Sequence, residues 1–170
     1  SFRLVFLLSV IILSACSSSD SVDPLAPMEQ NVEGTVSISA LNGLSGNDAT
    51  AIVTFGNGQA AATYTTEAIA GDAIDYKINT SSANTEIRII NFRFNLAAST
   101  ASFDDWESNF IVVTDTLSSP AKSYIEVNRD AANGDDYKFD IDFKVYVNGV
   151  SDGKIYYVDP KIRIKAKRIN

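Results

Sequence analysis

The chain has 170 residues, of which 45% are hydrophobic and 21% charged, and its formal net charge is −7. This composition indicates one folded domain rather than a disordered chain. With no His and a single Cys, the chain cannot build a Ser-His-Asp triad, a Cys-His nucleophile or a zinc site of His and Cys ligands. After the first 16 residues there are 26 Ile and Val residues against 5 Leu residues, which favours strands over helices.

The first 15 residues have the order of an export signal. Arg3 precedes residues 4–13, of which only Ser9 is polar, and small residues follow. A helix of ten residues is about 15 Å long, about half the thickness of the hydrocarbon core of a membrane. We therefore expect residues 1–15 to be a signal peptide and not a membrane-spanning helix.

The export signal ends at a short motif around the only cysteine. Residues 13–16 read Leu-Ser-Ala-Cys, which resembles the lipobox of bacterial lipoproteins. The resemblance implies that Cys16 receives a diacylglyceryl group and becomes the first residue of an exported protein. The segment is similar in style to outer-membrane and surface lipoproteins of Bacteroidota, and it does not decide between the periplasmic and the surface face. A plain secretory signal with an incidental Cys is the alternative.

Residues 16–30 are rich in Ser, Asp and Pro and predict a flexible tether. From residue 31 to residue 170, apolar and polar residues alternate with a period of two, and turn residues interrupt the pattern. We expect an all-β domain over 31–170: an antiparallel β-sandwich of about ten strands with an immunoglobulin-like fold. A small β-barrel is the alternative. Strands are expected at residues 32–41, 51–55, 60–66, 73–80, 86–96, 110–115, 123–128, 137–147, 154–158 and 161–167.

The clearest alternation lies in residues 137–147, which predict one buried face and one face in solvent. The adjacent apolar residues Ile89 and Ile90 break the alternation of their segment and predict a β-bulge, or a strand covered on both faces. The one helical turn that we expect lies at residues 103–109.

Two turns are predicted from residues that tolerate a positive φ. Residues 56–58 (Gly-Asn-Gly) predict a hairpin. Residues 151–153 (Ser-Asp-Gly) are expected to close a later hairpin, and residues 148–149 (Asn-Gly) are the rival turn.

The distribution of charge bears on partners. Residues 17–160 hold 8 bases and 21 acids, which argues against nucleic acid as a partner. Lys161, Arg163 and Lys165 alternate with apolar residues in the last predicted strand. We interpret them as a charged edge that discourages pairing with other sheets, and contact with anionic lipid is the alternative.

The only Trp is the first candidate site. Trp106 lies next to three carboxylates, those of Asp104, Asp105 and Glu107. An indole ring can stack on a sugar and carboxylates accept hydroxyl protons, so this cluster is a candidate for contact with a glycan or a protein. The alternative is a Trp in the core with its charged neighbours in solvent.

The second candidate site is a loop before the strand at 137–147. Asp130, Asn133, Asp135 and Asp136 surround Gly134 and offer the oxygen ligands that calcium takes. The spacing does not match an EF-hand, and the same residue types also favour turns. Calcium is the one cofactor that this pattern suggests.

The function predicted from these patterns is non-catalytic. The sequence contains no nucleophile elbow, phosphate loop or cofactor fingerprint, and it marks out no pair of acids as catalytic. A hydrolase that uses only carboxylates is the alternative, because a pair of acids can hydrolyse glycosides without His. We expect an exported cell-envelope lipoprotein, anchored in the outer membrane by its N-terminal lipid, with a binding or assembly role. Its partner would be an envelope protein or a glycan, met by loops or by an exposed strand edge. The alternatives are a glycan-binding accessory module of a polysaccharide-handling system and a small barrel that binds an apolar ligand.

Overall fold

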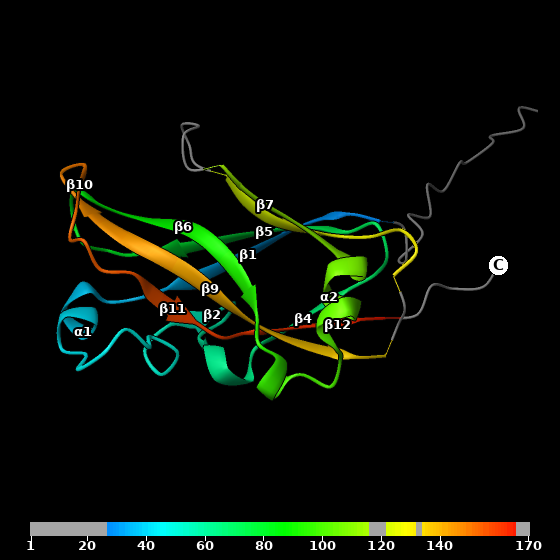
Figure 1. The fold of residues 1–170 in the computed structure, drawn as a ribbon. Coiled ribbons are helices and arrows are strands. Elements are labelled where there is room, and N and C mark those ends of the chain that lie inside the picture. Colours follow the sequence, from blue (N-terminus) through cyan, green and yellow to red (C-terminus); the bar gives the residue numbers. More distant parts are fainter. Residues whose placement is uncertain (1–26, 116–121, 132–133, 166–170) are drawn as a thin grey trace, which may run out of the picture.

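The computed structural model describes residues 27–115, 122–131 and 134–165. In these residues the chain forms twelve strands in two six-stranded sheets (Figure 1). The strands are β1 (Glu29–Thr35), β2 (Thr54–Phe55), β3 (Gln59–Ala60), β4 (Thr65–Ala68), β5 (Ala73–Asn79), β6 (Thr85–Phe94), β7 (Phe110–Asp115), β8 (Lys122–Val127), β9 (Asp136–Val147), β10 (Val150–Ser151), β11 (Tyr156–Val158) and β12 (Lys161–Ile164). The helical segments are α1 (Ile38–Asn42), α2 (Phe103–Asn109) and two 3-10 turns, η1 (Ala61–Thr63) and η2 (Leu96–Ala98). A mostly β, two-sheet protein is thus confirmed.

Both sheets are mixed rather than antiparallel. The first has the order β3-β2-β1-β5-β8-β7, in which β1 and β5 are parallel. The second is built on β9, which pairs with β6 along one edge and with β12, β11 and β10 along the other; β4 is parallel to β12. The prediction of a purely antiparallel sandwich is therefore wrong, because alternation along one strand says nothing about the direction of its neighbour. The sheets are not closed into a barrel, so that alternative is wrong as well.

The core lies between the sheets and is rich in aromatic residues. On β9, Tyr137, Phe139, Ile141 and Phe143 are fully buried. The ring of Phe139 lies edge-on to that of Tyr76 in β5, with 5.6 Å between the centroids. Side chains of this size supply most of the apolar area that stabilises the domain.

The other face of β9 is covered, which corrects the prediction that it lies in solvent. Lys138, Asp140 and Asp142 are at most 9% exposed. The segment before β4 crosses this face, and Nζ of Lys138 donates a hydrogen bond to the carbonyl oxygen of Ala62 at 3.2 Å. Alternation shows which side chains share a face, whereas burial depends on residues far away in the sequence.

The predictions of individual turns, of the bulge and of the strand at 32–41 are confirmed in part. The hairpin at residues 56–58 joins β2 to β3, and the bulge in β6 lies between Ile89 and Asn91, as predicted. The turn after β9 is the rival one: Asn148 and Gly149 both have a positive φ, at 50° and 80°, and close the β9–β10 hairpin. The predicted strand at 32–41 is wrong in its second half, where α1 forms instead. No helix in the described part of the chain is long and apolar enough to cross a membrane.

Candidate binding site

The acidic residues beside Trp106 belong to the start of α2. Oγ of Ser102 accepts a hydrogen bond from the backbone N–H of Asp105 at 3.1 Å, and the carboxylate of Asp105 accepts one from the N–H of Ser102 at 3.0 Å. This reciprocal pair is a capping box. The Ser102 side chain and backbone hold the pKa of the Asp105 carboxyl below its ordinary value. Asp105 therefore caps the helix, while Asp104 and Glu107 are exposed.

Trp106 itself is packed inside the protein. It is 6% exposed, and its ring centroid lies 4.6 Å from that of Phe110, 5.4 Å from that of Phe94 and 5.8 Å from that of Phe139. A ring held between these neighbours has no free face for a sugar. The geometry therefore gives no support to a glycan site built on Trp106.

The loop suggested for calcium lies partly outside the described residues, since Asn133 is not among them. Arg163 holds the carboxylate of Asp136 at both oxygens, with distances of 2.6 and 2.9 Å, and lowers its pKa. Asp130 is exposed and Asp135 is half-buried. Among the described residues, no group of three or more His, Cys, Asp and Glu side chains could hold a metal ion. Calcium stays a prediction.

Cys16, the predicted lipidation site, also lies outside the described residues. Its role rests on the sequence motif alone.

The covered face of β9 holds a cluster of charges that the sequence did not reveal, in which Lys138, Asp140 and Asp142 are buried and Arg93 is exposed. Arg93 binds Asp142 through two hydrogen bonds of 2.7 and 2.8 Å and lies 3.1 Å from Asp140. Nζ of Lys138 lies 3.3 Å from Oδ1 of Asp159. Burial raises the pKa of Asp140, against the opposing effect of Arg93. Because each charge faces an opposite one, we interpret the cluster as a set of links from β9 to β6, through Arg93, and to the residue that follows β11, Asp159.

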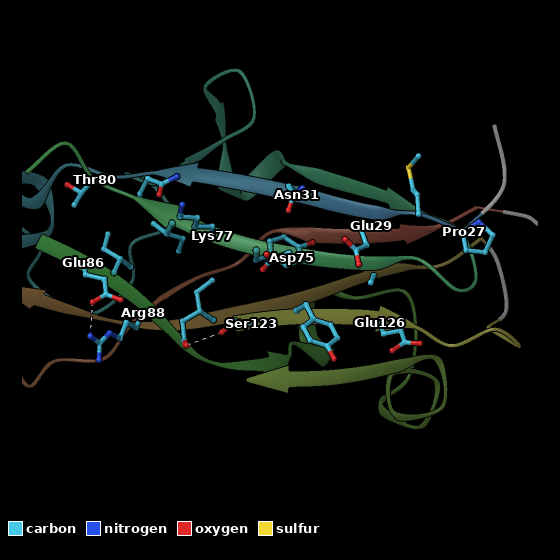
Figure 2. Close-up of a pocket in the computed structure, with 18 of the residues that line it drawn as sticks. Pro27, Glu29, Asn31, Asp75, Lys77, Thr80, Glu86, Arg88, Ser123 and Glu126 are labelled. Atoms are coloured by element: carbon cyan, nitrogen blue, oxygen red, sulfur yellow. Dashed lines mark hydrogen bonds and ion pairs between the residues drawn. The ribbon is translucent and has the colours of Figure 1, made fainter. Parts of the chain in front are cut away.

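A groove of about 960 Å³ is lined by residues of β1, β5 and β8 in the first sheet and of β6 in the second, and it is the strongest candidate for binding (Figure 2). Exposed side chains of two parallel strands form its floor, where Asn31 of β1 lies opposite Asp75 of β5 and Lys77 follows along β5. Glu126 of β8 and the first half of β6 border it.

The groove has an excess of acidic groups. Its charged lining residues are Glu29, Asp75, Lys77, Glu86, Arg88 and Glu126. One of the two bases is engaged, because Arg88 donates a hydrogen bond of 2.7 Å to Glu86. This contact lowers the pKa of Glu86 and raises that of Arg88. With four acids and two bases, the lining carries a formal charge of −2, which favours cationic groups.

The groove forms where β8 and β5 separate. Strand β8 pairs with β5 only as far as the Asp75–Tyr124 position, and from there it pairs with β7 alone. The second half of β5 therefore has a strand partner only on the β1 side, among the strands of the described residues. The sequence shows each strand but not where two strands separate, so it could not reveal this groove.

The architecture is known from a solved structure. No family model matches the chain, and no curated protein matches it. The crystal structure of an inclusion body protein, PixA, from Burkholderia cenocepacia J2315 has a TM-score of 0.55 to this chain, with 10% sequence identity. The fold is similar to that of PixA. The likeness to PixA covers 82% of this chain and 97% of that chain, and at this identity it shows the fold alone.

Proposed function

We propose that this protein is an exported cell-envelope lipoprotein with a non-catalytic binding or assembly role, anchored in the outer membrane by a lipid on Cys16. The groove between β5 and β6 carries the binding part of the proposal. Its lining combines apolar side chains with charged ones, among which acids outnumber bases, and a strand edge lies along it, which suits contact with a partner. The non-catalytic part rests on a sequence that has no nucleophile elbow, phosphate loop or cofactor fingerprint and marks out no pair of acids as catalytic.

The anchor fits the position of the folded body. Cys16 is followed by 12 residues before β1 begins at Glu29, a segment that spans at most about 45 Å when extended. Two or three acyl chains, at about 0.8 kcal/mol for each buried methylene, hold a protein on a membrane for long times. The groove would then face partners close to the membrane.

The structure bears differently on the finer prediction of the fold and on the two alternative functions. An immunoglobulin-like topology remains part of the proposal. The likeness to an inclusion body protein shows the fold alone and carries neither a role nor a ligand to this chain. A glycan module built on Trp106 loses its basis because that ring is buried, and a barrel for an apolar ligand loses its basis because the sheets are open.

The anchoring is tested by changing Cys16 to Ala in the full chain. Without the thiol no diacylglyceryl group can be attached, so we expect the variant to move from the detergent phase to the aqueous phase on phase separation. The intact mass of the wild type should exceed that of its processed polypeptide by the acyl groups. A Cys16→Ala protein that stays in the detergent phase would contradict the anchor.

The binding role is tested by purifying the lipidated protein from its native membrane after mild cross-linking. We expect one envelope component to be retained in a fixed ratio, and to be lost when Glu29 and Glu126 in the groove are both changed to Lys. Recovery of the protein with no stable companion would contradict the proposal.

A further inference from the structure

We propose that the groove binds an extended, basic peptide segment of a partner protein, which adds as a strand to the open edges of β5 and β6. The inference rests on the proposed function and names the class of partner. It follows from the direction of the backbone groups, the side chains between them and the charge of the groove.

Among the described residues, no strand pairs with β5 at Ile78 on the side away from β1. The N–H of Val36 donates a hydrogen bond of 2.9 Å to the carbonyl oxygen of Asn79, so the backbone groups of Asn79 point toward β1. Successive residues of a strand point their backbone groups to opposite sides. Those of Ile78 therefore point away from β1, on the side where β8 no longer pairs with β5.

The edge of β6 faces the same groove. The N–H of Asn148 donates a hydrogen bond of 2.8 Å to the carbonyl oxygen of Asn84, which directs the backbone groups of Asn84 toward β9. By alternation, those of Ile87 and Ile89 point away from β9. Oγ of Ser123 reaches the carbonyl oxygen of Ile89 at 3.2 Å, which agrees with this direction. Among the strands of the described residues, β6 pairs only with β9.

The space between these edges suits a strand. Both edges contribute lining residues, which include the apolar Ile78, Ile87 and Ile89. Figure 2 shows the charged side chains that β5 and β6 add to the lining, those of Asp75, Lys77, Glu86 and Arg88. A strand sends alternate side chains to opposite faces, so a segment with alternating apolar and polar residues matches this lining. Main-chain hydrogen bonds give such added strands their affinity, and pockets for alternate side chains give them specificity.

The excess of acidic residues in the groove favours a basic partner segment. The groove has four acids and two bases, and Arg88 already binds Glu86. The part of β5 that has no β8 partner, residues 76–79, extends about 13 Å, so an added strand would pair with β5 over about four residues. We therefore expect Lys or Arg at the polar positions of the partner.

The test uses synthetic peptides as probes and the folded protein as receptor. A nine-residue peptide of alternating Val and Lys should bind, and the same peptide with Glu in place of Lys should bind at least tenfold more weakly. In hydrogen exchange, the Val-Lys peptide should slow the exchange of the amides of Ile78 and Ile87. Absence of binding by the Val-Lys peptide, or no change at these amides, would overturn the proposal.

A proline substitution tests the backbone contact. The N–H of Ile87 points away from β9, so Ile87→Pro removes a donor for the added strand without removing a bond to β9. We expect the affinity for the Val-Lys peptide to fall at least tenfold. The matched control is Val112→Pro: Asn109 points its carbonyl at β8, so the N–H of Val112 points to the open side of β7, outside the groove. Equal binding to wild type and Ile87→Pro would overturn the proposal.

A second variant keeps the test decisive if Ile87→Pro does not fold by circular dichroism. Changing Glu29 and Glu126 to Gln leaves every backbone group in place, and we expect it to weaken Val-Lys binding about tenfold through lost charge attraction. Unchanged affinity would overturn the choice of a basic segment. If the peptide tests fail while the lipidated wild type still retains a membrane companion, only this inference fails; if no companion is retained, the proposed function fails.

Discussion

Asp140 shows how much a residue's role depends on what covers it. In the sequence it alternates with apolar residues and looks like a solvent-facing group, yet in the structure it is 9% exposed, beside Arg93 and Asp142. Its Oδ1 is buried and has no hydrogen-bond partner in the described structure. Burial makes the charged form costly, which is why its pKa is raised.

This raised pKa predicts a pH-dependent stability difference. The folded state holds the Asp140 proton more tightly than the unfolded state, so the stabilisation is present below the ordinary pKa of 3.8 and is lost as the pH rises through the raised value. Asp140→Asn removes this loss of stability, because the Asn side chain does not ionise. We expect the stability of the variant relative to wild type to be higher at pH 7 than at pH 3.5, measured by urea unfolding at both pH values. A difference that is constant across this range would contradict the burial effect.

The sequence gives the type of each candidate residue but does not show whether its side chain lies in the core or on the surface. A Trp among carboxylates fits a sugar site and a core position equally well, and only the rings packed around Trp106 decide between them. The role of Asp105 could have been predicted, since Ser102 and Asp105 have the spacing of a capping box. The partner of Asp136 could not, because Arg163 reaches it from another strand.

At the scale of elements, local signals were reliable where an element depends on its own residues. The predicted strand at 110–115 and the predicted helical turn at 103–109 match β7 and α2. Strand alternation and helix capping both depend on residues that are close together in the sequence. The parallel pairing of β1 with β5 is different, because about 40 residues separate the two strands and only packing in the folded state brings them together.

The close approach of Gly34 in β1 to Phe55 in β2 gives a testable prediction. A Cβ added to Gly34 would lie 2.7 Å from Cε1 of Phe55, a ring that is fully buried and stacked on Tyr64. We expect Gly34→Ala to lower the free energy of unfolding by about 1–3 kcal/mol, because the buried ring has to move. Chemical denaturation measures this change.

The matched control for that substitution is Gly46→Ala. A Cβ at Gly46 would meet nothing within 4 Å. Its effect should stay within about 0.5 kcal/mol, as for most surface changes. Equal effects of the two substitutions would show that Gly34 is not there to accommodate Phe55.

At the scale of the whole molecule, the separation of β8 from β5 links the fold to the proposed function. It leaves strand edges open next to an acidic groove, on a body whose sequence predicts a lipid anchor at its N-terminal end. Sequence reasoning suggested an exposed strand edge as one way to meet a partner, but the position of that edge is a property of the assembled sheets. The same fold in PixA shows that this architecture is not specific to one sequence.

The most direct measurement of the central claim is site-specific photo-cross-linking in the native membrane. A photoreactive amino acid is placed at Glu126 in the groove of the lipidated full-length protein, and in a matched sample at the exposed Glu107 on α2, outside the groove. We expect one discrete cross-linked species from position 126, absent from position 107 and reduced by an excess of the Val-Lys peptide. No species from position 126, or the same species from both positions, would contradict a binding role for the groove.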